Sequence, residues 1–157
     1  MLTEFALPVH LSERCLFHTG PEVKNPKFVL HWMRGAIRLD ECPTFDVARL
    51  ISDSLNLPLI VYQGIDERYP HASYRHHRFL MEGAADIANR AEELGVEYLL
   101  HISRKGHRKP VLRELSLQSA IVITDLMDLN PWKKWTKSLT KYNSVIEVDS
   151  TCVLPRT

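Results

Sequence analysis

Five short apolar runs, each separated from the next by a segment with helix signals, place the strongest constraint on the fold of this chain. The runs cover residues 28–33, 59–62, 98–102, 120–124 and 145–148. A short apolar run such as residues 28–33 is typical of a strand buried on both faces, as in parallel sheets covered by helices. Alternation of strand and helix predicts an α/β fold, a doubly wound Rossmann-like domain with helices on both faces. We expect a five-stranded parallel sheet in the order 3-2-1-4-5, with residues 28–33 as its central strand.

The segments between the runs carry ordinary helix signals. Helices are expected after Pro43, from Ser73 to Gly95, over 110–118 and after Asn130-Pro131. In the longest of these, apolar residues recur on one stripe that includes Phe79, Leu80, Ala84, Ile87, Ala91 and Leu94. Gly95 suits the left-handed position that commonly follows a helix.

Length and composition indicate one globular domain with flanking segments. The chain has 157 residues and a formal net charge of +1, which gives no global electrostatic argument for a nucleic-acid partner. Prolines and a glycine punctuate residues 1–27, which we predict to be an irregular N-terminal arm. The α/β domain is predicted over 28–149, and residues 150–157 are expected to be a C-terminal tail or linker.

The cysteines and the hydropathy of the chain indicate in which cellular compartment the protein is located. Three cysteines with no CxxC spacing disfavour a disulfide scaffold and favour a reducing environment. No apolar stretch approaches the roughly 18 residues needed to span a bilayer, so no membrane partner is expected. The first residues lack the basic region of a signal peptide, and we predict a cytoplasmic protein.

The loop after the first apolar run places two arginines where doubly wound domains usually bind ligands. Arg34 and Arg38 follow that run, and Asp125 follows the fourth run. Because such ligands lie beyond the carboxyl ends of the strands, we predict that Arg34, Arg38 and Asp125 line a cleft there. The guanidinium groups would grip a carboxylate or phosphate of the ligand. Salt bridges to Glu41 or Asp125 are the structural alternative, and ion pairs of that kind are common.

Several other kinds of site are not indicated. None of the six glycines forms a GxGxxG or GxxxxGK[ST] motif, so the backbone cradle of dinucleotide and P-loop sites is missing. Neither GxSxG nor a cysteine-nucleophile signature occurs, and no catalytic residue is predicted. His71, His76 and His77 have no partner at a zinc-like spacing, so no metal site is predicted. His31 and His101 are expected to be hydrogen-bonded core histidines.

Two basic segments, residues 104–109 and 132–141, remain. Basic residues beside aromatic ones can bind nucleic acid through phosphate contacts and stacking. Trp132 and Trp135, however, are three residues apart on one helix face, which favours packing of both indoles on the sheet. Nucleic-acid binding by this domain alone is therefore the less favoured interpretation.

Four groups of residues resemble segments of the photolyase and cryptochrome family, in the same order along the chain. They are Trp32-Met33-Arg34 with Arg38 and Pro43, residues 75–83, residues 123–126 with Trp135, and residues 146–149 with 153–155. The Trp-Met pair and Gly83 resemble the class II photolyases. The sequence departs from the pattern at Ala36 and Cys42, where many relatives carry Asp and Asn, and Glu41 stands where Asp is usual.

The resemblance implies the N-terminal antenna domain of a DNA photolyase or cryptochrome. In such proteins this domain can hold a light-harvesting chromophore, an 8-hydroxy-deazaflavin or a folate, so Arg34, Arg38 and Asp125 become candidate cofactor-binding residues. FAD and the pyrimidine-dimer lesion bind in a helical domain further along. We therefore expect FAD and DNA to be bound only through that partner domain, and no repair by this chain alone. A stand-alone Rossmann-like binding or interaction module without photochemistry is the alternative.

Overall fold

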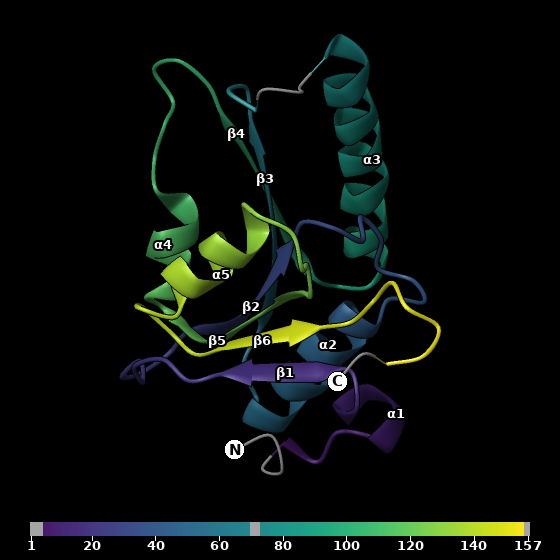
Figure 1. Ribbon diagram of the computed structural model, residues 1–157, viewed down its shortest axis with the longest axis vertical. Coiled ribbons are helices and arrows are strands. Elements are labelled where there is room, and N and C mark those ends of the chain that lie inside the picture. The colour runs from purple at the N-terminus through teal and green to yellow at the C-terminus, as the bar shows by residue number, and fades with distance from the viewer. Residues whose placement is uncertain (1–4, 70–72, 156–157) are drawn as a thin grey trace.

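One six-stranded sheet forms the centre of the structure, a computed structural model that describes residues 5–69 and 73–155. Its strands are β1 (Cys15–His18), β2 (Phe28–Met33), β3 (Leu59–Asp66), β4 (Glu97–Ser103), β5 (Ser119–Asp125) and β6 (Val145–Val148). They lie in the order β1-β6-β5-β2-β3-β4 (Figure 1). Neighbours from β6 to β4 are parallel, whereas β1 runs antiparallel to β6.

The predicted five-stranded, wholly parallel sheet is therefore wrong by one strand. The predicted strands do lie side by side as β4-β3-β2-β5-β6, but β1 adds to the outer edge of β6, with Cys15 opposite Val148. This strand and the short helix α1 (Val9–Ser12) fall within residues 1–27, which were predicted to be irregular. A four-residue strand among prolines has no periodic signal of its own, since it is stabilised by a partner remote in sequence.

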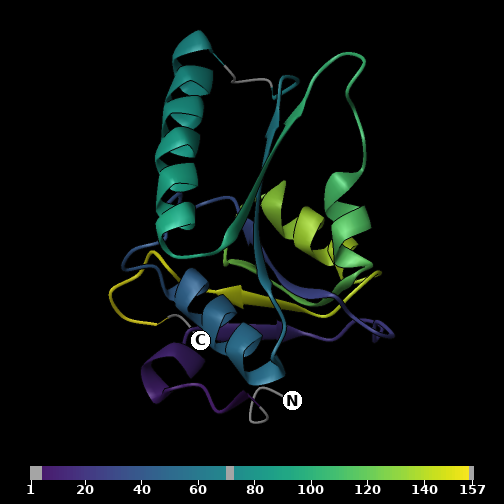
Figure 2. The same ribbon diagram turned by 180° about the vertical axis from the view of Figure 1, so that it is seen from behind.

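Helices cover both faces of the sheet (Figures 1 and 2). On one face lie α2 (Pro43–Leu55) and α3 (Tyr74–Glu93), and on the other lie α4 (Val111–Ser116) and α5 (Trp132–Leu139). None of the helices in the described ranges combines the length and apolar composition that a bilayer crossing requires.

Strand β2 is the centre of the core because all six of its residues are buried. Its side chains alternate between the two faces, as the pleat of a strand requires. Val29 and Met33 pack in the cluster with α2 and α3, while Leu30 and Trp32 pack in the cluster with α4 and α5. The apolar run thus supplies both layers of the core at once.

Helix α3 packs on the sheet only through its second half. Ala84, Ile87 and Ala91 are buried, but Tyr74 is 82% exposed and Phe79 is 67% exposed. The predicted apolar stripe is therefore wrong at Phe79. Figure 1 shows the reason: the first half of α3 and the ends of β3 and β4 extend well beyond β2. The predicted start at Ser73 is confirmed, since its side chain accepts a hydrogen bond from the His76 N–H at 3.2 Å.

The start of the predicted C-terminal tail lies against the N-terminal segment. Arg14 donates hydrogen bonds to the carbonyl oxygens of Cys152 and Val153, at 2.7 and 3.0 Å. Ser150 is buried and contacts Asp125. The division into 1–27, 28–149 and 150–157 as separate units stays a prediction.

Candidate functional site

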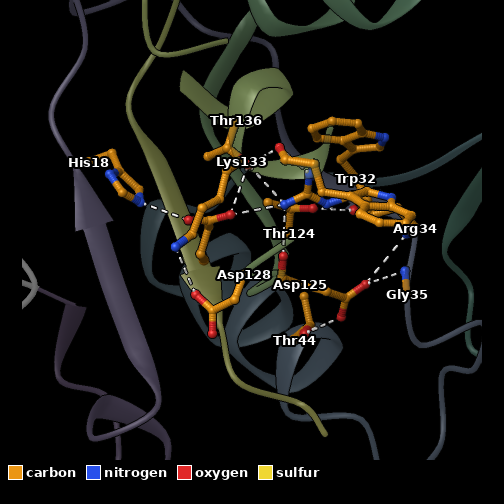
Figure 3. Close-up of polar contacts among 12 residues, drawn as sticks. His18, Trp32, Arg34, Gly35, Thr44, Thr124, Asp125, Asp128, Lys133 and Thr136 are labelled. Carbon is orange, nitrogen blue, oxygen red and sulfur yellow. Dashed lines mark hydrogen bonds and ion pairs between the residues drawn. The ribbon is translucent and has the colours of Figure 1, made fainter. Parts of the chain in front are cut away.

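Asp125, the last residue of β5, organises the loop that follows β2 (Figure 3). Its Oδ2 accepts hydrogen bonds from the backbone N–H groups of Gly35 and Ala36, at 2.8 and 3.2 Å. Its Oδ1 accepts from the hydroxyls of Thr44 and Ser150, at 2.8 and 2.7 Å. The side chain is 1% exposed, so this carboxylate is committed to holding the loop, α2 and residue 150 together.

The charge of Asp125 is maintained by these contacts. Burial acts to raise the pKa of Asp125, but the field of His31 and hydrogen bonds from Ser150, Gly35 and Thr44 outweigh it and lower the pKa. Burial lowers the pKa of His31 to about 4, against the opposing effect of Asp125, so His31 is neutral at pH 7. The hydrogen bonds therefore keep Asp125 ionised at neutral pH.

The expectation that His31 is hydrogen-bonded is wrong. Its ring is fully buried beside Phe45, with ring centroids 6.1 Å apart, and within the described residues neither ring nitrogen has a hydrogen-bond partner. His101, the second histidine expected in the core, has a partner: its Nδ1 lies 3.3 Å from the Tyr62 hydroxyl.

Arg34 enters a second buried polar cluster, beside Asp125 (Figure 3). Its Nη2 donates to the Asp125 carbonyl at 2.8 Å, to Thr136 Oγ1 at 2.9 Å and to Glu147 Oε1 at 3.0 Å. The side chains of Arg34 and Glu147 are each 6% exposed, so this is a buried ion pair. The guanidinium carbon also lies 4.4 Å from the centre of the Trp32 ring.

Glu147 extends the cluster toward the surface. Its Oε2 lies 2.9 Å from Nε2 of His18 on β1, so the cluster links β1, β6, α5 and the loop after β2. Burial lowers the pKa of Arg34, while the charges of Glu147 and Asp125 act to raise it. A guanidinium stays protonated in proteins, so the net effect is a fixed positive charge at the end of β2.

Arg38 lies apart from this cluster. Its Nε donates to the backbone carbonyl of Glu41 at 3.3 Å, and its Nη2 lies 3.5 Å from the carbonyl of Ser150. The two departures from the family pattern in the same loop point inward, because Ala36 is 7% exposed and Cys42 is fully buried.

A cleft of about 710 Å³ opens at the carboxyl ends of β2 and β3. It lies between the first half of α3 and the start of α5, and we name it the α3–α5 cleft. Its walls include Arg34, Ile65, Arg68, Leu80, Trp132 and Trp135. Arg38 and Asp125 are not among the residues that line it. The structure therefore brings Arg34 and Asp125 together but places only Arg34 at the cleft.

Several important residues were not singled out from the sequence. Glu147 and Thr136 complete the Arg34 cluster, and Leu80 and Arg68 line the cleft. Glu147 had a usable signal, since an acidic residue inside a buried strand requires a charged partner. Leu80 was expected only as a residue of the apolar stripe and of the segment 75–83, and Arg68 was not singled out, because their place at the cleft depends on how far α3 and β3 extend beyond β2.

The histidines considered for a metal site show no such arrangement in the described ranges. There, no three His, Cys, Asp or Glu side chains are grouped as metal ligands would be. The ring of His76 lies near those of Tyr69 and His77, with centroids 5.8 and 6.1 Å away and the rings tilted by 36° and 44°. His71 lies outside the described residues.

The fold and cleft define an α/β domain with a ligand-sized cavity at the carboxyl edge of its parallel strands. The chain is similar to the deoxyribodipyrimidine photolyase of Methanothermobacter thermautotrophicus, with 27% identity over 137 residues. The match covers 86% of this chain, whereas the chain spans only 30% of that photolyase. This distant similarity supports a place in the photolyase family. No protein-family model matches the chain.

Proposed function

We propose that this chain is a photolyase-related antenna domain, closest to class II, whose α3–α5 cleft binds a light-harvesting chromophore. The observation that carries the proposal is the position of the cleft, beyond β2 and β3, in a chain similar to a photolyase. The volume of about 710 Å³ falls within the range typical of small-molecule sites, roughly 300–1,000 Å³.

The lining of the cleft fits a planar heteroaromatic ligand with polar groups. Ile65, Leu80 and Trp132 provide apolar and aromatic surface, and Arg34 and Arg68 provide positive charge. The Arg34 Nε has no hydrogen-bond partner among the described residues, but it is buried, so a ligand would meet Arg34 as a fixed positive charge in the cleft wall and not through this atom. An 8-hydroxy-deazaflavin or a folate matches this description. Such a group, when bound, would absorb light and transfer its excitation energy.

The three predicted cofactor-binding residues take different parts in this proposal. Arg34 contacts the ligand from the end of β2. Asp125 acts as a positioning residue, since its hydrogen bonds to Gly35 and Ala36 fix the backbone beside Arg34. A role for Arg38 stays a prediction, because its contacts are with backbone carbonyls away from the cleft.

The partner in this proposal is a helical FAD-binding domain. Such a domain would receive the energy and would make the contacts with DNA. The chain on its own is then expected neither to retain FAD nor to repair pyrimidine dimers. We propose a cytoplasmic location on the basis of the three cysteines, none of which is disulfide-bonded.

Titration of the purified chain with 8-hydroxy-deazaflavin or a reduced folate tests the proposal. We expect saturable binding of one of them, measured by ligand fluorescence anisotropy. Leu80→Trp should weaken it by about tenfold or more, because the indole would occupy part of the cleft. The matched control is Phe79→Trp, next to it on the exposed side of α3, which should leave binding unchanged.

Two results would contradict the proposal. One is the absence of saturable binding of either ligand to the folded chain, which would favour the interaction module without photochemistry. The other is equal binding by the Leu80→Trp and Phe79→Trp variants, which would place the ligand outside the α3–α5 cleft.

A further inference from the structure

A second hollow, which we name the basic groove, lies on the face of the sheet covered by α4 and α5 and adjoins the α3–α5 cleft, with which it shares Ile65, Asp66, Arg68 and Trp135. It has a volume of about 570 Å³ and is bounded by β3, β4, α4 and α5. The groove exists because the strands differ in length. Pairing of β2 with β3 ends at Met33 and Gln63, whereas β3 and β4 continue as a pair to Asp66 and Ser103. In Figure 1 the paired ends of β3 and β4 extend past α4 and α5. These two helices leave that part of the sheet uncovered.

Aromatic side chains form the floor and one wall of the groove. Trp32 and Tyr62 line it from β2 and β3 and are 7% and 4% exposed. Trp135 and Tyr142 line it from α5 and the turn after it, and Trp135 is 44% exposed. Trp135 therefore packs against the rest of the protein only in part, whereas packing of both indoles on the sheet was expected. A flat ligand entering the groove would find accessible ring surface at Trp135, since Trp32 and Tyr62 are almost fully buried.

The charged residues at the rim are mostly cations. Arg68, Lys109 and Arg113 line the groove with one carboxylate, that of Asp66, which leaves an excess of two positive charges. Asp66 accepts hydrogen bonds from the Arg68 guanidinium at 2.6 and 3.0 Å. The Arg113 guanidinium carbon lies 4.8 Å from the centre of the Tyr142 ring, which orients its donors at the groove edge.

Residues of both basic segments line the groove, although none of the lysines of residues 132–141 is among them. Lys109 comes from residues 104–109, and Trp135 and Ser138 come from residues 132–141. Antenna binding in the α3–α5 cleft gives no role to Lys109 or Arg113. The same chain also lacks a glycine-rich phosphate loop, so any phosphate contact must come from side chains of this kind.

We propose that the basic groove binds a nucleotide, either free or as one unit of a single strand. The base would stack on the exposed ring of Trp135, and the phosphate would lie at Lys109 and Arg113. Stacking on an aromatic ring tolerates any base, and cations at the rim match the phosphate charge. Trp135 and Arg68 line both cavities, but Lys109, Arg113 and Tyr142 line only the basic groove, so variants of Lys109 and Arg113 test this inference separately from the antenna proposal.

Titration of the full chain by tryptophan fluorescence tests the inference, with AMP, an eight-nucleotide oligothymidylate and inorganic phosphate as probes. We expect saturable quenching by AMP or the oligonucleotide and none by phosphate alone. Lys109→Ala and Arg113→Ala should each weaken binding by about tenfold, the usual effect of losing one charged hydrogen bond. Both side chains are exposed, so the variants should fold normally.

Two control variants locate the binding. Lys134→Ala removes an exposed cation of α5 outside the groove lining and should change affinity little. Leu80→Trp, which narrows the α3–α5 cleft, should leave nucleotide binding intact. Tight, salt-sensitive binding of the oligonucleotide alone would identify a strand as the ligand, and equal affinity for AMP would identify a free nucleotide. The inference is overturned if neither nucleotide probe saturates, if phosphate alone competes equally, or if Lys109→Ala and Arg113→Ala bind like the parent chain.

Discussion

Two parts of the sheet use their polar residues in opposite ways: the strands β2, β5 and β6, which we call the buried end, and the extended pair β3 and β4, which we call the projecting end. In β2, β5 and β6 nearly every side chain is buried, and the carboxylates of Asp125 and Glu147 are bonded to other parts of the chain. In β4, buried positions are lacking, and the ribbon it forms with β3 is bordered by the cleft and the groove. The buried end holds the fold together, while the projecting end offers surface for ligands.

This difference changes how the charged residues singled out in the sequence are interpreted. Arg34 and Asp125 were singled out as ligand-binding residues, but most of their contacts are internal. Arg68 and Leu80, on the projecting side, line the cleft, although Arg68 belongs to none of the motifs and Leu80 was expected only on the apolar stripe of its helix and in the segment 75–83. A conspicuous charged residue in this fold therefore indicates a structural role first, and a binding role only where it also reaches a cavity.

The largest expected effect comes from removing the carboxylate at the buried end. Asp125→Ala would leave the N–H groups of Gly35 and Ala36 and the hydroxyls of Thr44 and Ser150 without their acceptor. We expect a loss of about 4 kcal/mol in the free energy of unfolding, measured by urea denaturation.

The matched control is Asp66→Ala at the projecting end. Asp66 forms an exposed pair with Arg68, and such pairs contribute less than about 1 kcal/mol. If the two variants lost similar stability, the contrast between the two ends of the sheet would be wrong.

The next effect is a pH dependence that originates in the buried end. The pKa of His31 in the folded protein is about 4, below the ordinary value of 6.5, so the unfolded chain binds a proton first as the pH falls. The free energy of unfolding should therefore decrease between pH 6.5 and pH 4, and the contribution of His31 should be constant below pH 4. The total decrease from His31 should be about 3 kcal/mol, since one pKa unit corresponds to about 1.4 kcal/mol.

Comparison with His31→Phe isolates that contribution. Phenylalanine fills the same space beside Phe45 and does not titrate, so the difference in unfolding free energy between parent and variant should change with pH. A difference that stays constant from pH 7 to pH 4 would show that His31 has an ordinary pKa and is not buried as described.

The smallest effect concerns α3, which covers the projecting end. Gly95 has φ +65 after the helix, so Gly95→Ala should cost about 1 kcal/mol through backbone strain alone, with open space around the new methyl group. Gly83→Ala, inside α3, should instead stabilise by about 0.5 to 1 kcal/mol, because its nearest contact, Ile37 Cγ2, is at 3.7 Å. Opposite signs in thermal or urea unfolding would confirm both geometries, and equal signs would contradict them.

Much of the fold could be predicted because the signals are local. The runs that became β2, β3, β4, β5 and β6 are rich in apolar residues, and the caps around α3 are short-range patterns. Strand β1 could not be predicted, since Cys15–His18 has no periodicity and gains its structure from Val145–Val148. Phe79 was misplaced because helical periodicity does not tell how far a sheet extends beneath a helix.

The candidate site was less predictable. The general position, at the carboxyl ends of the strands, follows from the doubly wound topology. The topology does not tell which charged residues are buried in structural contacts and which are exposed. That depends on contacts such as the one between Arg34 and Glu147, which are 113 residues apart. The two ligand-sized cavities arise from differences in strand length, a property that residue patterns do not contain.

Strand β1 has a consequence for the order in which the protein assembles during synthesis. His18 and Glu147 are 129 residues apart, so β1 leaves the ribosome long before the strand it pairs with. At translation rates of about 5–20 residues per second, β1 must wait for several seconds or longer without a partner. The earliest strand to be made is thus the last to join the sheet. A ribosome that stalls before β6 would leave both Cys15 and the open edge of β5 accessible to other chains.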